Sequence, residues 1–277
     1  MGPLGPMAED MRSLTTLTFD VVGTVIDFEQ GICDWWLPRL GGDHLGGARR
    51  GGARPGRPGD NARAGDAAQA PAGARAPDAE NPPAAEEILS AFAEAEDRLQ
   101  NTHPEMAFTQ MLPRIYEELA ERWGVEQSEE AAVSFQRSIE EWPPFEDSVE
   151  ALRRLGHSYR LVAVTNADRW ATEAMSRTIG DQFHELVSCD EVGVNKPDHR
   201  VFAYALEKLG ASRQEVLHVA QSQYHDIGGA RSFGLKTAWV ERRAGTGSTG
   251  ATPQTRNVVE PDMHVHSLAE LAEVLRR

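Results

Sequence analysis

The second half of the chain alternates short apolar runs with amphipathic segments, and this alternation limits the fold more than any other feature. The apolar runs are rich in β-branched residues and predict strands at 159–165, 185–188, 216–220 and 236–240. The amphipathic segments predict helices at 147–156, 169–179, 200–209, 226–233 and 268–275. Strands separated by helices form right-handed crossovers, and the helices then cover both faces of a parallel sheet. The sequence therefore predicts an α/β fold.

A further strand is predicted near the start of the chain, within LTTLTFDVVGTVIDF at 14–28. The apolar run ends at Phe19, Asp20 follows at once, and Gly23 and Thr24 form a turn. Open α/β sheets place their chemistry at the carboxyl ends of strands, in tight loops of this kind. Asp20 is therefore a candidate catalytic residue, although Asp is also an ordinary turn residue.

A helical region separates this strand from the alternating half. Apolar residues at helical spacing from Glu86 to Trp142 predict roughly three helices, with Gly124 as a stop and Ser128 as a cap. A further short helix can start within 30–40. Segment 41–85 has a single large aliphatic residue and no aromatic one, so it cannot bury enough apolar surface to offset chain entropy. It is predicted to be disordered, and 244–261 is predicted to form a flexible loop near the C-terminus.

Composition excludes several classes of function. The chain has 277 residues and a net charge of −15, which disfavours general binding to nucleic acid because phosphates would repel it. Its two cysteines, Cys33 and Cys189, form no CxxC pair, so a zinc site or disulfide scaffold is not expected and a reducing cytoplasm fits. No apolar run reaches the roughly 20 residues of a membrane helix, and the first residues lack a signal-peptide pattern.

Polar residues follow several of the predicted strands or precede the next helix. Because the carboxyl ends of neighbouring parallel strands meet at one crevice, these side chains are expected to converge. They are Asp20, Thr165, Asn166, Lys196, Ser222 and Asp226. An ionised carboxylate beside a lysine stays charged, and amide groups of the loop after Asp20 can hold an anion.

The motifs FDVVGT, VTN, GVNKPDHRVF and VAQSQYHDIGGARSFGLKTAWV, in this order, resemble the haloacid dehalogenase superfamily of aspartate-nucleophile hydrolases. The resemblance implies a Rossmann-like parallel sheet core with an inserted helical cap domain. The core would comprise 14–28 and 143–277, and the cap 29–142 with the disordered insertion 41–85. Residues 1–13 would form a flexible tail. The resemblance also allows a homodimer.

The same resemblance assigns roles to the converging residues. Asp20 would be the nucleophile and Thr24 would orient its carboxylate. Lys196 would pair with Asp20 and with the charge of the intermediate, and Asp226 would position or activate the hydrolytic water. The substrate's anionic group would bind to Thr165, Asn166 and Ser222.

The residue two positions after the nucleophile separates the branches of this superfamily. Its phosphatases resemble DxD, in which the second Asp protonates the leaving oxygen, and Val22 cannot do so. A halide leaves as an anion and needs no proton. The sequence thus resembles the type II 2-haloacid dehalogenases and predicts hydrolysis at carbon of a small 2-substituted carboxylic acid, without a cofactor. Two alternatives stay open: a Mg²⁺-dependent phosphatase and a non-catalytic binding protein on this fold.

The sequence also departs from the dehalogenase pattern. That family has an Arg early in the cap that helps receive the halide, and none matches it around 88–95. Candidates elsewhere, each also typical of a solvated helix, are Arg39, Arg98 and Arg114. Phe202 stands where a tyrosine is expected, and Gln223 where an asparagine is expected. Another small carboxylic acid with an activated carbon is therefore an alternative substrate.

Other residues leave two interpretations. His225 can act as an acid or base near neutral pH, or as a structural turn residue. Three aromatic residues of the cap either line an apolar substrate cavity or pack in the core: Trp35, Trp36 and Phe92. Four histidines show no ligand spacing and receive no role: His157, His184, His264 and His266.

Overall fold

The computed structural model describes residues 11–41, 83–245, 250–252 and 258–276. Its centre is a sheet of six parallel strands in the order β3-β2-β1-β4-β5-β6. The strands are β1 (Thr16–Phe19), β2 (Arg160–Thr165), β3 (Glu185–Ser188), β4 (Val216–Ala220), β5 (Lys236–Val240) and β6 (Met263–Val265). Although β1 comes first in the chain, it lies in the middle of the sheet. The predicted α/β fold is confirmed.

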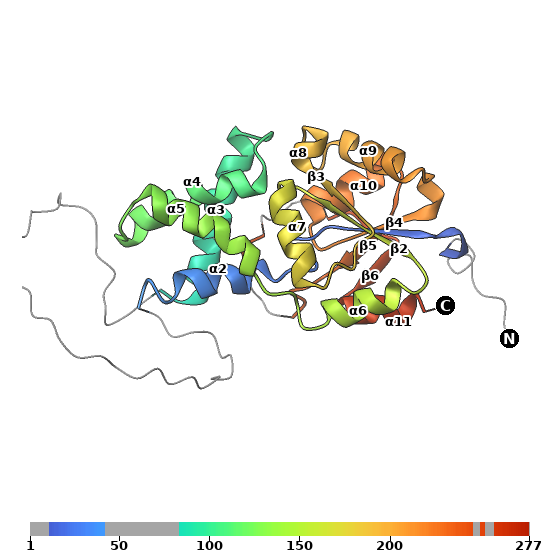
Figure 1. The fold of residues 1–277 in the computed structure, drawn as a ribbon, viewed down its shortest axis with the longest axis horizontal. Coiled ribbons are helices and arrows are strands. Elements are labelled where there is room, and N and C mark those ends of the chain that lie inside the picture. Colours follow the sequence, from blue (N-terminus) through green and yellow to red (C-terminus); the bar gives the residue numbers. More distant parts are fainter. Residues whose placement is uncertain (1–10, 42–82, 246–249, 253–257, 277) are drawn as a thin grey trace, which may run out of the picture.

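Helices cover both faces of this sheet (Figure 1). Below it lie α6 (Ser148–Leu155) and α11 (Leu268–Val274), which contact each other. Above it lie α8 (Cys189–Val192), α9 (His199–Leu209) and α10 (Gly228–Phe233). The remaining elements around the sheet are α7 (Arg169–Thr178), η1 (Met11–Ser13), η3 (Arg213–Glu215) and η4 (Gln223–Ile227). Among the described residues, no helix combines the length and apolar character needed to cross a membrane.

A helical unit stands beside the sheet and lies between β1 and β2 in the chain (Figure 1). It consists of α2 (Phe28–Trp36), α3 (Ala85–Thr102), α4 (Phe108–Trp123), α5 (Glu129–Arg137) and η2 (Ser138–Glu141). Gly124 ends α4 in the left-handed conformation, which glycine adopts without a steric penalty. The side chain of Ser128 accepts a hydrogen bond from the amide of Ala131 and caps α5. Both signals had been predicted from the sequence.

The structure differs from the sequence predictions in several places. Strand β6 was missed, because three residues are too few to display an alternating pattern. The helix predicted at 226–233 starts with one π-helical turn, η4, before α10 begins. Residues 11–13, assigned to the tail, form η1. The predicted disordered insertion lies outside the described residues except at 41 and 83–85.

The register of the central strands places their carboxyl ends level with one another. Phe19 on β1 pairs with Ala163 on β2 and with Val219 on β4. Asp20 therefore leaves the sheet between two strands that end at the same height. Polar residues that follow these strands must meet at this edge, which is where open α/β sheets bind ligands.

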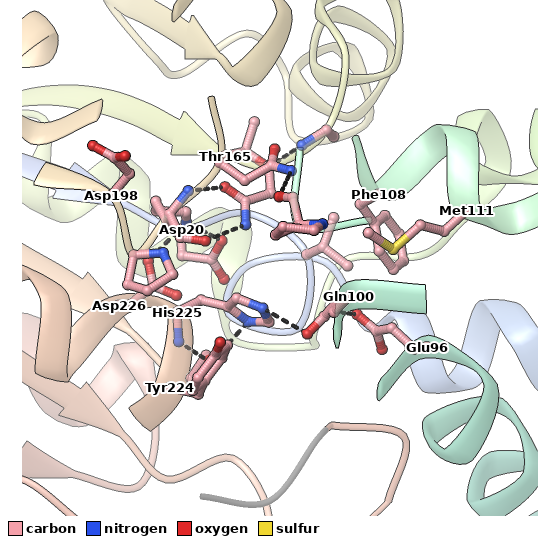
Figure 2. A pocket seen from close by; sticks show the side chains of 18 of the residues that line it. Asp20, Glu96, Gln100, Phe108, Met111, Thr165, Asp198, Tyr224, His225 and Asp226 are labelled. Carbon is pink, nitrogen blue, oxygen red and sulfur yellow. Dashed lines mark hydrogen bonds and ion pairs between the residues drawn. The ribbon is translucent and has the colours of Figure 1, made fainter. Parts of the chain in front are cut away.

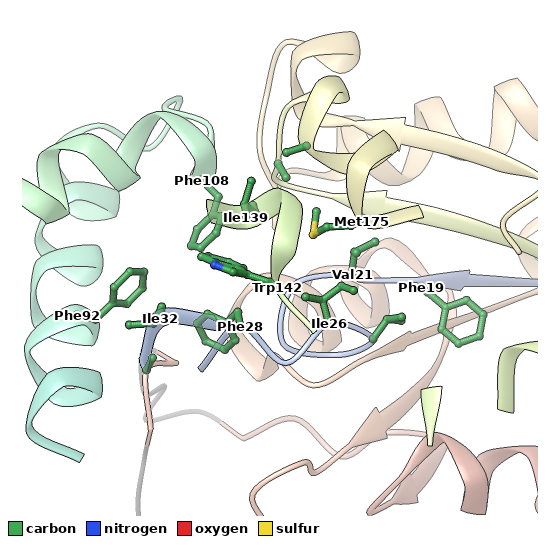
Figure 3. Close-up of a cluster of buried hydrophobic side chains, with 14 of the residues drawn as sticks. Phe19, Val21, Ile26, Phe28, Ile32, Phe92, Phe108, Ile139, Trp142 and Met175 are labelled. Carbon is green, nitrogen blue, oxygen red and sulfur yellow. The ribbon is translucent and has the colours of Figure 1, made fainter. Parts of the chain in front are cut away.

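One hydrophobic core runs from the sheet into the helical unit (Figure 3). Phe19 lies at the sheet end of this core, and Phe92 lies at the far end on α3. Between them the rings of Phe28 and Trp142 have centroids 6.4 Å apart. Fully burying a large apolar side chain stabilises the fold by roughly 1.5–3 kcal/mol, so this continuous core ties the helical unit to the sheet.

Gly31→Ala tests the packing at this junction. A Cβ at Gly31 would lie 2.3 Å from Cδ1 of Trp142, whose ring is fully buried. Alanine favours a helix over glycine by about 1 kcal/mol, but overpacking costs about 1–3 kcal/mol. An approach of 2.3 Å to a fully buried ring belongs at the upper end of the overpacking range, so the variant is expected to lower the free energy of unfolding by about 2 kcal/mol in urea titrations. Gly228→Ala is the control, because its Cβ would meet no atom closer than 3.4 Å. Equal stability of Gly31→Ala and wild type would contradict this packing.

Candidate active site

A cavity of about 510 Å³ lies between the carboxyl ends of the central strands and the helical unit (Figure 2). Its floor carries Asp20, Lys196 and Asp226. Its opposite wall, from the helical unit, carries Phe108 and Met111. Further lining residues are Val22, Phe28, Glu96, Gln100, Thr165, Asn166, Gln221, Ser222 and His225. All seven site residues predicted from the sequence lie here or, in the case of Thr24, directly behind Asp20.

Asp20 is held by the loop that follows β1. Thr24 Oγ1 donates a hydrogen bond of 2.8 Å to Asp20 Oδ2 and accepts one of 2.9 Å from the amide of Gln221. The loop turns at Gly23 with φ at 83°, a left-handed conformation that favours glycine. The tight turn brings Thr24 back to the carboxylate and fixes the orientation of Asp20.

The ammonium of Lys196 joins the two carboxylates of the site. Its Nζ donates to Asp20 Oδ1 at 2.8 Å, to Asp226 Oδ1 at 2.7 Å and to the carbonyl of Val164 at 2.8 Å. An ammonium has three donors, so all of them are used. The Lys196 side chain is only 1% exposed, and a charge this deeply buried requires such partners.

Asp226 has a second partner that sequence reasoning missed. His218 on β4 is fully buried, and its Nε2 lies 2.9 Å from Asp226 Oδ1. A carboxylate only accepts, so Nε2 donates to Asp226, and Nδ1 lies 2.9 Å from Oγ1 of Thr18 on β1. The available signal was a histidine inside the apolar run VLHVA.

Burial and neighbouring charges together set the pKa values of Asp20, Asp226 and Lys196. Burial raises the pKa of Asp20; Lys196 opposes this rise and the charge of Asp226 adds to it. Burial would also raise the pKa of Asp226, but Lys196 and the hydrogen bond from His218 lower it to about 2. The two carboxylates outweigh the burial of Lys196 and raise its pKa, so the lysine stays protonated.

Donors for an anion lie beside Asp20. Among the described residues, no acceptor pairs with the backbone amides of Val21 and Val22. Thr165 Oγ1 accepts from the amide of Ala167 at 3.2 Å and keeps its own hydrogen for a further acceptor. These groups can hold a carboxylate or another oxyanion next to Asp20.

Asn166 and Ser222 make different contacts from those expected of direct substrate ligands. The Asn166 amide donates to the carbonyl of Lys196 at 3.0 Å and accepts from the amide of Lys196 at 2.7 Å, so it holds the lysine backbone in place. Ser222 Oγ accepts from the amide of His225 at 3.1 Å and caps η4. One Asn166 N–H remains for a ligand.

A line of polar side chains crosses from α3 to the sheet (Figure 2). His225 Nε2 lies 3.1 Å from Gln100 Oε1, and Gln100 Nε2 donates to Glu96 Oε1 at 2.7 Å. Burial lowers the pKa of His225 to about 4, so its ring is neutral. Burial raises the pKa of Glu96 to about 8, so this carboxyl group is uncharged at neutral pH. The sequence offered no signal for Glu96 or Gln100, which look like ordinary residues of an exposed helix.

The three candidate arginines do not reach the cavity. Arg39 lies over the Trp35 ring at 3.7 Å, Arg98 pairs with Glu118 on the surface, and Arg114 does not line the site. Arg200 lines the rim but pairs with Asp198 at 2.7 Å. The aromatic residues of the cap were predicted either to line the cavity or to pack in the core. Trp35, Trp36 and Phe92 are buried in the core of the helical unit and do not line this cavity.

Comparison with known proteins agrees with this geometry. The model of the haloacid dehalogenase-like hydrolase family matches residues 14–234. The chain belongs to this family. A (S)-2-haloacid dehalogenase of Pseudomonas sp. (strain YL) is 34% identical over 135 residues, which cover 46% of this chain and 52% of the relative. A phosphoserine phosphatase of Thermus thermophilus is 29% identical over 169 residues, 58% of this chain and 65% of the relative.

The solved structure of the L-2-haloacid dehalogenase from Xanthobacter autotrophicus, with chloropropionic acid covalently bound, has the same fold. The TM-score is 0.67 at 17% identity, over 95% of this chain and 98% of that one. By sequence, the chain spans about half the length of the dehalogenase relative that it matches. The family and the fold are thereby shown.

Magnesium, which the phosphatase alternative requires, does not suit the residues present. The ion needs near-octahedral oxygen ligands, usually including carboxylates. Here the Oδ1 atoms of Asp20 and Asp226 both accept hydrogen bonds from the Lys196 ammonium, and a cation between the two carboxylates is thus already supplied by the chain. Val22 supplies no side-chain oxygen. We therefore derive no step through Mg²⁺.

Lys196→Met tests the charge balance of the site. Removing one partner of a buried ion pair costs about 3–5 kcal/mol, because buried Asp20 loses its cation and buried Asp226 keeps only the contact with His218. Their pKa values then rise above the unfolded value, so the variant gains relative stability as pH falls. The deficit against wild type, from urea titrations, is expected to be largest at pH 7 and smaller at pH 5.

Lys208→Met is the matched control. Its ammonium contacts Glu185 and Glu191 at 3.1 and 2.6 Å, but the Lys208 side chain is 21% exposed. The expected cost is about 1 kcal/mol or less. A deficit in Lys196→Met that is no larger than in Lys208→Met, or that is independent of pH, would contradict the proposed charge balance.

Proposed function

We propose that this hydrolase displaces a substituent from carbon 2 of a small 2-substituted carboxylic acid, such as a 2-haloacid, with Asp20 as the nucleophile and without a metal. The observation that carries this proposal is the cluster in which the Lys196 ammonium binds both Asp20 and Asp226, together with the apolar Val22. The cluster presents an oriented carboxylate but offers no general acid beside it. Such a site suits a leaving group that departs as an anion.

The reaction has two steps. An oxygen of Asp20 attacks carbon 2, the bond to the substituent breaks, and the substituent leaves with the electron pair, so that an ester forms on Asp20. Water then attacks the ester carbonyl and Asp226 takes one of its protons. The bond between the carbonyl carbon and the substrate oxygen breaks, the proton on Asp226 passes to that oxygen, and the 2-hydroxy acid leaves, while the Asp20 carboxyl group loses its proton to water. Asp226 Oδ2 pairs with no group in the described part of the chain and can receive this water. Lys196 stabilises the carboxylate that is regenerated.

The substrate carboxylate is held by the amides of Val21 and Val22 and the hydroxyl of Thr165. Val21 and Val22 follow Asp20 in the loop after β1, and Thr165 ends the neighbouring strand β2. Asn166 contributes its remaining N–H and positions Lys196, and Ser222 positions His225. The neutral state of Glu96 suits an anionic substrate, because it adds no negative charge to the opposite wall.

The helical unit acts as the cap, within the proposed cap boundaries of 29–142. Its apolar wall at Phe28, Phe108 and Met111 excludes water from the displaced substituent. Free, buried Cys33 and Cys189 fit a reducing cytoplasm. The homodimer stays a prediction.

Two other functions remain distinguishable by experiment. The relation to a phosphoserine phosphatase favours phosphoester hydrolysis, which would require Mg²⁺ and vanish with a chelator. A non-catalytic binding protein would bind its ligand equally well after Asp20→Asn and turn nothing over.

Halide release from L-2-chloropropionate tests the proposal directly. Wild type is expected to release chloride with EDTA present, and Asp20→Asn is expected to fall to background because its amide is not a nucleophile. Chloride is measured by ion chromatography. Asp198→Asn is the control, because it removes a carboxylate at the rim that pairs with Arg200. Chelator-sensitive hydrolysis of a phosphate ester, with no chloride release, would contradict the proposal and support the phosphatase alternative.

The pH dependence of KM tests the wall that faces Asp20. Glu96 is neutral below about pH 8 and ionised above it. Its charge would then repel the substrate carboxylate, so KM is expected to rise roughly three- to tenfold between pH 7 and pH 9. Glu96→Gln should keep KM flat, whereas Glu105→Gln, at an exposed position of the same cavity, should follow wild type. A rise in KM that persists in Glu96→Gln would assign the effect to another group.

A further inference from the structure

Three side chains with metal-binding atoms gather at the outer edge of the sheet, away from the cavity. β6 is the edge strand of the sheet. His264 lies within β6, and His266 directly follows the strand. Side chains of a strand alternate, so these two imidazoles share a face. The partner strand pairs Val240 with Val265, which brings Glu241 level with His266.

The three ligand atoms have the spacing of a metal site. Glu241 Oε2 lies 2.8 Å from His264 Nε2 and 3.7 Å from His266 Nδ1, and all three atoms lie within 4.8 Å of one another. Ligand atoms about 2.0–2.1 Å from a tetrahedral Zn²⁺ are about 3.3–3.4 Å apart. The two distances to Glu241 Oε2 differ from this value by less than an ångström, and the two imidazole nitrogens lie within 4.8 Å of each other. The side chains are 35–59% exposed, which leaves room for water as a fourth ligand.

The arrangement around these side chains is also ordered. The Trp239 ring stacks on His264 with centroids 4.4 Å apart and an angle of 21°. The amide of Glu241 donates to the carbonyl of Val265 at 2.8 Å and holds the two strands together at this point. A surface ion pair between His264 and Glu241 would explain one contact and is worth about 1 kcal/mol at most. It would not require the second imidazole to face the same oxygen.

A second cluster in the described chain does not meet the same test. Asp168, Cys189 and Asp190 lie close together, but Thr109 donates to Asp168 and the amide of Arg169 donates to Asp190. Burial raises the pKa of Cys189 to about 12, which disfavours the thiolate that a metal binds.

We propose that Glu241, His264 and His266 form a site for one divalent transition-metal ion of the zinc class at the β6 edge. Two imidazoles and one carboxylate suit Zn²⁺, Co²⁺ or Ni²⁺, whereas Mg²⁺ and Ca²⁺ prefer oxygen ligands alone. The site is separate from the catalytic cluster and is independent of the proposed reaction.

The site has a structural connection to the nucleophile. Trp239 Nε1 donates to the carbonyl of Gln221 at 2.9 Å, and the amide of Gln221 donates to Thr24, which orients Asp20. An ion that holds the His264 ring would brace Trp239 and the loop after β4. Binding is therefore expected to raise the thermal unfolding midpoint, because the ion binds the folded chain only.

Calorimetric titration of the whole chain with ZnCl₂, in a buffer that does not bind zinc, tests the proposal. His264→Gln and His266→Gln are each expected to lose one equivalent of Zn²⁺ or to bind it about tenfold or more weakly than wild type. His157→Gln is the control, because it removes an exposed imidazole from another part of the surface. Comparison with the control separates this site from zinc bound by other histidines.

Thermal unfolding supplies the second measurement. Zn²⁺ is expected to raise the unfolding midpoint of wild type and His157→Gln, but not that of His264→Gln or Glu241→Gln. Without Zn²⁺ all four proteins should unfold at similar temperatures, since the substituted side chains are exposed. Mg²⁺ at equal concentration should shift none of them. Wild-type stoichiometry and affinity in both histidine variants would overturn the proposal.

Discussion

The site depends on one buried ammonium shared by two buried carboxylates. Without Lys196, Asp20 and Asp226 could not both stay charged in this buried site, because burial alone favours their neutral forms. Lys196 in turn could not be buried without three acceptors. The loop after β1, the end of β2 and the π-helical turn after β4 must therefore come together for any of the three charges to be tolerated. Asn166 binds the backbone of Lys196 and holds it in the position from which the ammonium reaches its three acceptors.

The helical unit completes the site because it shares its core with the sheet. Trp142 and Phe28 pack where the two parts meet, and the cavity lies beside this junction. Its wall is apolar at Phe108 and Met111 and polar along Glu96 and Gln100. The contact from Gln100 to His225 links the wall to the loop that carries Asp226. Movement of α3 would thus change the surroundings of Asp226 and the shape of the cavity together.

Much of the fold and site followed from local patterns. Strands, helix caps and turns depend on neighbouring residues, so β1, β2, β4, Gly124 and Ser128 were predicted where they occur. The convergence of the strand-end residues followed from the rule that parallel strands end at one edge. The exact partners did not follow. Asn166 binds the Lys196 backbone, and Trp35 and Trp36 pack in the helical core, because side-chain direction depends on what surrounds it.

The sequence alone determined the α/β class, the family motifs and the catalytic candidates, since these rest on short-range periodicity and on residues next to strand ends. Only the tertiary structure decided which distant groups touch them. Glu96 became a buried, uncharged acid because α3 packs over the cavity, and His218 became the partner of Asp226 because the π-helical turn η4 packs against β4. Glu241 lies beside His264 and His266, which had no role predicted from the sequence, because β6 pairs with β5. Such contacts depend on how whole segments pack against one another, which short-range periodicity does not specify.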